Sequence, residues 1–196
     1  MLINFLILYA NIFSFSENII NNSKWELRKD ENSIKVYLRK NDNNVSEYLA
    51  VTEVNSDINS ILNFILDFDN SYRWMYKLEE SEILEKNNDS LFHVYFKIEM
   101  SWPLKKRDLV SDVRIFKDDE EIVVTLNSSP KFIPLNKDFV RINDSKSEWI
   151  LTKIDSNTTK VSLQSYAVIE KIPSFVVDMF ILDGPLHSLS NLRKRF

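Results

Sequence analysis

The chain of 196 residues has no cysteine and only one glycine. The missing cysteines exclude disulfides, thiol catalysis and cysteine-ligated zinc. The scarcity of glycine excludes phosphate-cradling loops, dinucleotide fingerprints and the Gly-x-Ser-x-Gly nucleophile elbow. An excess of positive charge is also missing, since the net charge is −4 at pH 7. We therefore expect no nucleic-acid partner, because such proteins need basic side chains for phosphate contacts.

The composition, with 44% hydrophobic and 28% charged residues, is typical of a soluble globular protein. A chain of this length suits one domain and buries enough surface for a sizeable core with a cavity inside it. We expect a monomer.

The first segment is apolar from Leu2 to Phe15, apart from two asparagines, and then becomes abruptly polar. It is too short to span a bilayer, and Ser14-Phe15-Ser16 matches the small-x-small pattern of a signal-peptidase site. No Lys or Arg precedes Lys24, so an N-terminal helix packed on the domain or lying on a membrane surface is the alternative. The pattern predicts a signal peptide at 1–16, a single domain at 17–196, and export to the periplasm or beyond the cell. Without a signal peptide, the protein would be cytoplasmic.

Short apolar runs separated by Asn, Asp and Ser clusters predict an antiparallel meander. The predicted strands are Ile34–Arg39, Glu47–Val54, Leu91–Met100, Leu109–Phe116, Glu121–Leu126, Asp138–Ile142, Glu148–Ile154 and Val161–Ile169.

Two stretches have the apolar spacing of helices. In SDINSILNFILDF, apolar residues recur on one helical face and Ser56 is the expected N-cap. The second helix begins at Pro173 and runs to the C terminus, with Gly184-Pro185 expected to kink or interrupt it. This order favours an α+β fold in which a curved antiparallel sheet wraps around a long C-terminal helix and encloses a hydrophobic cavity.

Five stretches, in this order, resemble the START (steroidogenic acute regulatory protein-related lipid transfer) domain. They are WELRKDENSIKVYLRK, NSYRWMYKLEESEIL, WPLKKRDLVSDVR, FVRINDSKSEWILTKID and IPSFVVDMFILDGPLHSLSNLRKRF, and the resemblance covers nearly all of 24–196. The resemblance implies a helix-grip fold holding one hydrophobic ligand, such as a sterol or phospholipid, beneath the last helix. One departure is Ala167-Val168-Ile169-Glu170, where many members of the family have a glycine-rich turn. The identity of the ligand is therefore not carried over.

The candidate ligand-binding residues lie on several predicted elements. In the strand LFHVYFKIEM, alternation puts one set of side chains inward, where they either fill the core or line the cavity. Arg114 either points into the pocket, as the resemblance implies, or is solvated on the outer face and paired with Asp112. The full predicted set is Phe92, Val94, Phe96, Ile98, Arg114, Tyr166, Phe175 and Met179.

The loop NSSPKFIPLNKD holds Phe132 and Ile133 between two prolines. The resemblance places this loop at the ligand entrance, with transient membrane contact during lipid exchange; the alternative is a loop packed down on the core edge. In SWPLKKRDLV, adjacent strand residues point apart, so we expect Arg107 and Asp108 to contact different neighbours rather than each other.

The two histidines, His93 and His187, lie on different elements without carboxylates at metal-ligand spacing, so we expect no metal and no cofactor. The leading hypothesis is a non-enzymatic lipid-binding or lipid-transfer protein. An aromatase/cyclase-like enzyme on the same scaffold is the alternative, and a pure interaction module is the third possibility. The enzyme would need inward polar groups, for which the candidates are Tyr95, Asp112, Arg114, Tyr166 and Glu170.

Overall fold

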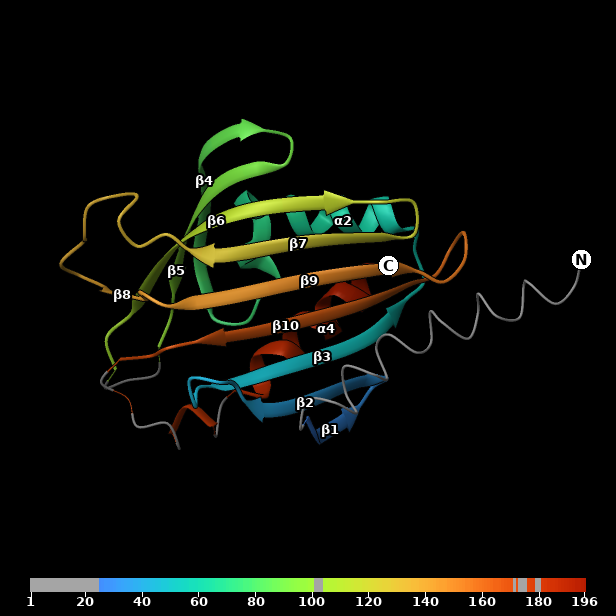
Figure 1. The fold of residues 1–196 in the computed structure, drawn as a ribbon, viewed down its shortest axis with the longest axis horizontal. Coiled ribbons are helices and arrows are strands. Elements are labelled where there is room, and N and C mark those ends of the chain that lie inside the picture. The colour runs from blue at the N-terminus through green and yellow to red at the C-terminus, as the bar shows by residue number, and fades with distance from the viewer. Residues whose placement is uncertain (1–24, 101–103, 171, 173–175, 179–180) are drawn as a thin grey trace, which may run out of the picture.

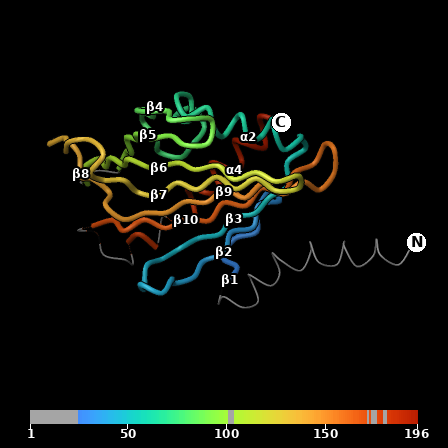
Figure 2. Tube along the Cα trace, turned by 45° about the horizontal axis from the view of Figure 1, so that its top comes forward, coloured from blue at the N-terminus to red at the C-terminus, as the bar shows by residue number. Residues whose placement is uncertain are grey.

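A computed structural model describes residues 25–196 apart from 101–103, 171, 173–175 and 179–180. Ten strands form one sheet in the order β1-β2-β3-β10-β9-β7-β6-β5-β4, antiparallel throughout, and the short β8 pairs in parallel with β6. Figures 1 and 2 show the strands as one curved layer. The strands are β1 Glu26–Glu31, β2 Ile34–Lys40, β3 Ser46–Val54, β4 Leu78–Asn88, β5 Leu91–Ile98, β6 Arg107–Lys117, β7 Glu121–Ser128, β8 Val140–Arg141, β9 Ser145–Lys153 and β10 Thr159–Ala167.

All eight predicted strands are present, and the two strands that were not predicted are the edges of the sheet. β1 and β4 have the sequences ELRKDE and LEESEILEKNN, in which charged residues hide the apolar alternation. Charged side chains on edge strands discourage pairing with other chains, which explains why edge strands lack a strong apolar signal.

The first helix, α2 (Ile58–Leu66), lies where the apolar spacing predicted it. Its N-cap is Asp57 rather than the predicted Ser56, because the Asp57 side chain accepts hydrogen bonds from the backbone N–H groups of Asn59 and Ser60. A 3₁₀ helix, η1 (Phe68–Arg73), follows it.

The last helix, α4 (Asp183–Arg195), is shorter than predicted. Gly184 and Pro185 lie in its first turn, where proline needs no backbone donor, so the helical stretch is interrupted before them rather than kinked, which is one of the two expected outcomes. Residues 176–178 are also helical and precede α4. Residues 1–16, Pro173, Phe175 and Met179 lie outside the described part of the chain, so the predictions made for them stay predictions.

Both α2 and α4 lie on the same side of the sheet, behind it in Figure 1. α4 packs on β2 and β3, and α2 packs on β9. We call the covered side the inner face and the other side the outer face. The core cluster joins inner-face residues such as Trp149, Leu151 and Val161 to Leu189 and Leu192 of α4. This is the predicted helix-grip arrangement, and it leaves the two faces of the sheet with different environments. Within the described residues, no helix has the length and apolarity needed to cross a bilayer.

Candidate functional site: the hydroxyl-lined end of the inner face

The inner face changes in character along the strands. At the end beneath the C-terminal part of α4, large apolar side chains are packed with almost no exposure; they include Val54, Val124, Trp149, Leu151, Val161 and Leu163. Further along the same strands, hydroxyl-bearing residues replace them. We call this set the hydroxyl belt; it consists of Ser46, Tyr48, Ser111, Ser128, Ser145, Ser147 and Ser165.

Strand register places the hydroxyl belt in two neighbouring rows. In the first row, Tyr48 pairs with Ser165, and Ser165 pairs with Ser147. In the second row, Ser111 pairs with Ser128. Five strands therefore contribute to one continuous polar strip, which alternation of side chains directs to the inner face.

Several inner-face residues at this end are only half-buried although α4 and the 176–178 turn lie on the same side. Tyr48, Ser147, Ser165 and Leu126 are of this kind, whereas Val161 and Leu151, at the apolar end, are completely buried. Small serine side chains leave space that leucine or tryptophan would fill. Part of the hydroxyl belt therefore keeps some solvent exposure, although Ser46, Ser111 and Ser145 are themselves buried.

The hydroxyl groups of the first row are linked to each other. Ser147 Oγ and Ser165 Oγ lie 2.7 Å apart, and the Tyr48 hydroxyl is hydrogen-bonded to Ser165. Burial raises the pKa of Tyr48 to about 12, so its hydroxyl stays protonated and able to donate at neutral pH. This row can therefore both donate to and accept from a polar group of a bound molecule.

The 176–178 turn is tied to the same end of the sheet by Asp178. Its carboxylate accepts hydrogen bonds from Ser46 Oγ, in the hydroxyl belt, and from Lys40 Nζ at 3.1 Å. These contacts hold the 176–178 turn next to Ser46 of the hydroxyl belt.

Arg107 lies on the inner face beyond the belt, four residues before Ser111 on β6. It is 4% exposed and donates to the carbonyl oxygens of Lys105 at 2.8 Å and Glu170 at 3.4 Å. Its Nε is buried and has no hydrogen-bond partner among the residues that the structure describes, and burial lowers the pKa of its guanidinium. The inner face thus ends, beyond the hydroxyl belt, at a buried cation whose hydrogen bonds are to neutral carbonyl groups.

Asp108 points to the outer face and forms a buried ion pair with Arg141, with an N–O distance of 2.8 Å. Tyr95 donates to the same carboxylate at 3.3 Å. Arg141 also donates to the carbonyl oxygens of Pro130 at 2.7 Å and Pro134 at 3.3 Å, which holds the loop between β7 and β8 against the outer face. The prediction that Arg107 and Asp108 contact different neighbours is confirmed.

The predicted ligand-binding residues fall on both faces. Phe92, Val94, Phe96 and Ile98 are on the inner face, where they belong to or pack against the core cluster. Whether they contact a ligand stays a prediction.

Arg114 and Tyr166 do not face the cavity. The Arg114 side chain is 57% exposed on the outer face and pairs with Asp112 at 2.9 Å, which is the solvated alternative. Tyr166 lies on the outer face of β10, where it donates to Asp144 at 3.2 Å. For Arg114 the solvated alternative is therefore correct, and the placement of Tyr166 among residues lining the cavity is wrong, because the apolar residues Val113 and Leu163 set the inward-facing positions of β6 and β10.

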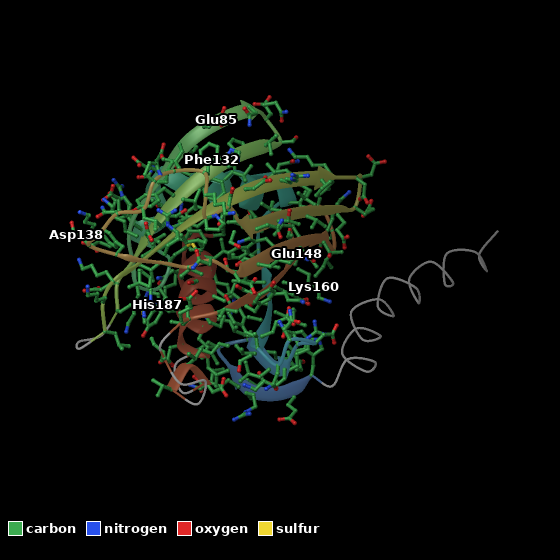
Figure 3. All side chains as sticks on the ribbon, turned by 60° about the vertical axis from the view of Figure 1, so that its left-hand side comes forward. Glu85, Phe132, Asp138, Glu148, Lys160 and His187 are labelled. Carbon is green, nitrogen blue, oxygen red and sulfur yellow. The ribbon has the colours of Figure 1, made fainter. Side chains whose placement is uncertain are left out.

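The predicted entrance loop also lies on the outer face. Phe132 stacks on His93 with ring centroids 3.7 Å apart, and His93 projects away from its inward neighbours Phe92 and Val94. In Figure 3 the labelled Phe132 and Glu85 lie together, and Glu85 Oε2 is 3.5 Å from His93 Nδ1. The stack on His93 and the Arg141 contacts to the carbonyls of this loop match the alternative of a loop packed down on the core edge, and whether Phe132 and Ile133 border the ligand entrance stays a prediction.

Replacing Phe132 with serine is therefore expected to change stability rather than ligand exchange. Loss of the aromatic stack should lower the free energy of unfolding by about 1 kcal/mol, measured by urea denaturation. Leu135→Ser is the control, because Leu135 is 73% exposed on the same loop and should change stability by less than about 0.5 kcal/mol. If Phe132→Ser exchanges ligand more slowly while its free energy of unfolding is unchanged, the result would favour the prediction that this loop borders the ligand entrance.

Sequence reasoning missed the hydroxyl belt and the inner position of Arg107. The alternation of residues along the strands could have revealed the belt. Each belt serine of β6, β7, β9 and β10 lies at an alternate position that shares its face with buried apolar residues of the same strand. Within the described residues no cluster of His, Asp or Glu has the arrangement of a metal site.

A scan against protein-family models found no match. An uncharacterized protein of Pseudomonas aeruginosa, PA1579, is 29% identical over 190 residues, covering 95% of this chain and 93% of that protein. The crystal structure of a STAR-related lipid transfer protein from Xanthomonas axonopodis matches with a TM-score of 0.81 and 27% identity, over 87% of this chain and 97% of that one. Human STARD10, at 15% identity, and a Streptomyces aromatase/cyclase, Zhui, at 11%, have TM-scores of 0.78 and 0.58. The match to STARD10 covers 92% of this chain and 77% of STARD10, and the match to Zhui covers 76% of this chain and 92% of Zhui. At such low sequence identities, both matches support the fold alone.

Proposed function

Because this chain is a member of the START-like helix-grip family, we propose that it binds one hydrophobic, lipid-like molecule between the inner face of the sheet and the C-terminal helical region. The observation that carries the proposal is the hydroxyl belt, which lies beside the buried apolar core and in which Tyr48, Ser128, Ser147 and Ser165 are half-buried. A site that is apolar with a few polar groups suits a ligand with a large hydrophobic body and few polar atoms.

The carrier function is favoured over an enzyme by where the polar residues lie. Among the five residues that an aromatase/cyclase-like reaction would use, Tyr95, Asp112, Arg114 and Tyr166 project from the outer face. The Streptomyces neighbour supports the shared scaffold, but a hydrophobic substrate on the inner face would not meet these four groups. We therefore propose binding and release without chemical change.

The test is native mass spectrometry of the full-length protein after gentle purification, with solvent extraction of the bound molecule. We expect a mass adduct that disappears on denaturation and is recovered as a lipid-like compound. No adduct, together with no binding of fluorescent fatty acid, sterol or phospholipid probes, would refute the proposal.

A pair of variants on neighbouring residues connects this binding to the inner face. Ser147→Phe should fill space at the hydroxyl belt and weaken probe binding about tenfold or more, equivalent to about 1.4 kcal/mol. Lys146→Phe is the matched control, since Lys146 is exposed and points to the outer face of the same strand. Equal binding by the two variants would place the ligand elsewhere.

A further inference from the structure

Arg107 is the buried cation that the fold does not neutralise. It is only 4% exposed, yet its hydrogen bonds to the described residues are to two backbone carbonyl oxygens. Within the described residues, no carboxylate oxygen lies within the 4.0 Å ion-pair distance of its guanidinium. Among the residues that the structure does not describe, 101–103, 171, 173–175 and 179–180 contain no Asp or Glu, and 1–24 contain only Glu17.

The carboxylates around Arg107 are engaged with other groups. Asp108 pairs with Arg141 on the opposite face of the sheet, and Glu79 pairs with Lys106 at 2.7 Å. The Glu170 carboxylate accepts a hydrogen bond from Asn143 at 3.1 Å. It raises the pKa of Arg107 through its charge but does not form an ion pair with it. The exposed Lys105 adds a further positive charge to this end of the sheet.

The chemistry of the guanidinium indicates what is missing. Its Nε is buried without an acceptor, and a planar guanidinium presents its N–H groups in a fork that fits a carboxylate or phosphate. Burying a cation without a counter-charge is unfavourable, so an anion that enters this site gains more than it would from a solvated arginine.

We propose that Arg107 binds the acidic head of the ligand, a carboxylate or a phosphate, and that the hydrophobic body of the ligand passes the hydroxyl belt. This inference rests on the proposed function and specifies its ligand class as anionic amphiphiles. Arg107 is four residues from Ser111 on the same face, about 13 Å along the strand. An alkyl chain attached to an acid held by Arg107 is long enough to cover that distance.

The test compares three single-chain ligands of equal length that differ only in the head: hexadecanoic acid, hexadecyl phosphate and hexadecanol. Their affinities for the delipidated full-length protein are measured by native mass spectrometry. We expect at least one anion to bind about 10- to 100-fold more tightly than the alcohol, as charged hydrogen bonds to a buried arginine imply. Preference for the carboxylate indicates a fatty-acid ligand, and preference for the phosphate indicates a phospholipid-type ligand.

Arg107→Gln should reduce the affinity for the preferred anion to that for the alcohol, and leave the affinity for the alcohol unchanged. Arg107→Lys, which keeps the charge without the fork, should retain part of the preference and serves where Arg107→Gln does not fold. Arg114→Gln is the matched control on the outer face of the same strand and should bind all three ligands like the wild type.

The outcomes separate this inference from the function on which it rests. Equal binding of acid, phosphate and alcohol by the wild type, or an unchanged preference in Arg107→Gln, would overturn the role of Arg107 and leave lipid binding intact. Such a result would make Arg107 a structural clamp between the carbonyls of Lys105 and Glu170. Failure of all three ligands and of neutral lipid probes to bind would overturn both proposals.

Discussion

Replacing Arg141 with methionine is expected to lower the free energy of unfolding by about 3–5 kcal/mol, the cost of leaving one charge of a buried pair uncompensated. The side chains of Arg141 and Asp108 are 3% and 1% exposed. Without Arg141, the Asp108 carboxylate would keep only the long hydrogen bond from Tyr95. For a chain of this length the loss corresponds to a melting temperature lower by about 6–20 °C.

The loop between β7 and β8 would lose its anchor in the same variant. Arg141 donates to three carbonyl oxygens of that loop, those of Pro130, Ile133 and Pro134. We therefore expect faster amide hydrogen exchange in residues 131–139 of Arg141→Met under conditions where the rest of the sheet remains protected.

The matched control lies on β6, the strand that holds Asp108. Arg114→Met removes the exposed partner of Asp112 and should cost no more than about 1 kcal/mol, because solvent screens such a pair. The double variant Asp108→Leu/Arg141→Met should recover much of the stability lost in the single variant, since it leaves no buried charge. Equal effects of Arg141→Met and Arg114→Met in chemical denaturation would show that the buried pair does not contribute as its burial implies.

The sequence was sufficient for the helix-grip fold because most strands carry an apolar run. The prediction missed β1 and β4, which are the edge strands of the sheet and have few inward-facing apolar residues. The long C-terminal helix was predicted from apolar spacing, but Gly184-Pro185 marks the start of α4 rather than a kink within a longer helix. Strand identity was thus easier to predict than the point where a helix begins.

The candidate site was harder to predict because it depends on which face of a strand turns inward. In β6, one phase holds Arg107, Leu109, Ser111 and Val113, and the other holds Asp108, Val110, Asp112 and Arg114. Both phases contain charged and apolar residues, so periodicity alone does not choose between Arg107 and Arg114. Packing against neighbouring strands decides: Val113 joins the core cluster, while Arg114 remains exposed.

Replacing Leu189 with alanine is expected to lower the free energy of unfolding by about 2–5 kcal/mol, the range for deleting a buried leucine side chain. Leu189 is completely buried in α4 and belongs to the core cluster formed with the inner face. The loss should appear as a lower denaturant midpoint with an unchanged slope, because the variant weakens packing without changing the extent of unfolding. Lys194→Ala, an exposed change on the same helix, should alter stability by less than about 0.5 kcal/mol.

This prediction also separates two ways in which a ligand could leave the inner face. If α4 is an integral part of the core, Leu189→Ala destabilises the whole domain, and the proposed ligand would have to exchange past the 176–178 turn, which Asp178 ties to Ser46 and Lys40. If α4 instead detaches readily, Leu189→Ala would have little effect on global unfolding but would accelerate hydrogen exchange within α4 alone. The complete burial of Leu189 and Leu192 favours the first case, in which the apolar end of the inner face provides stability and the proposed ligand would exchange at the hydroxyl-lined end.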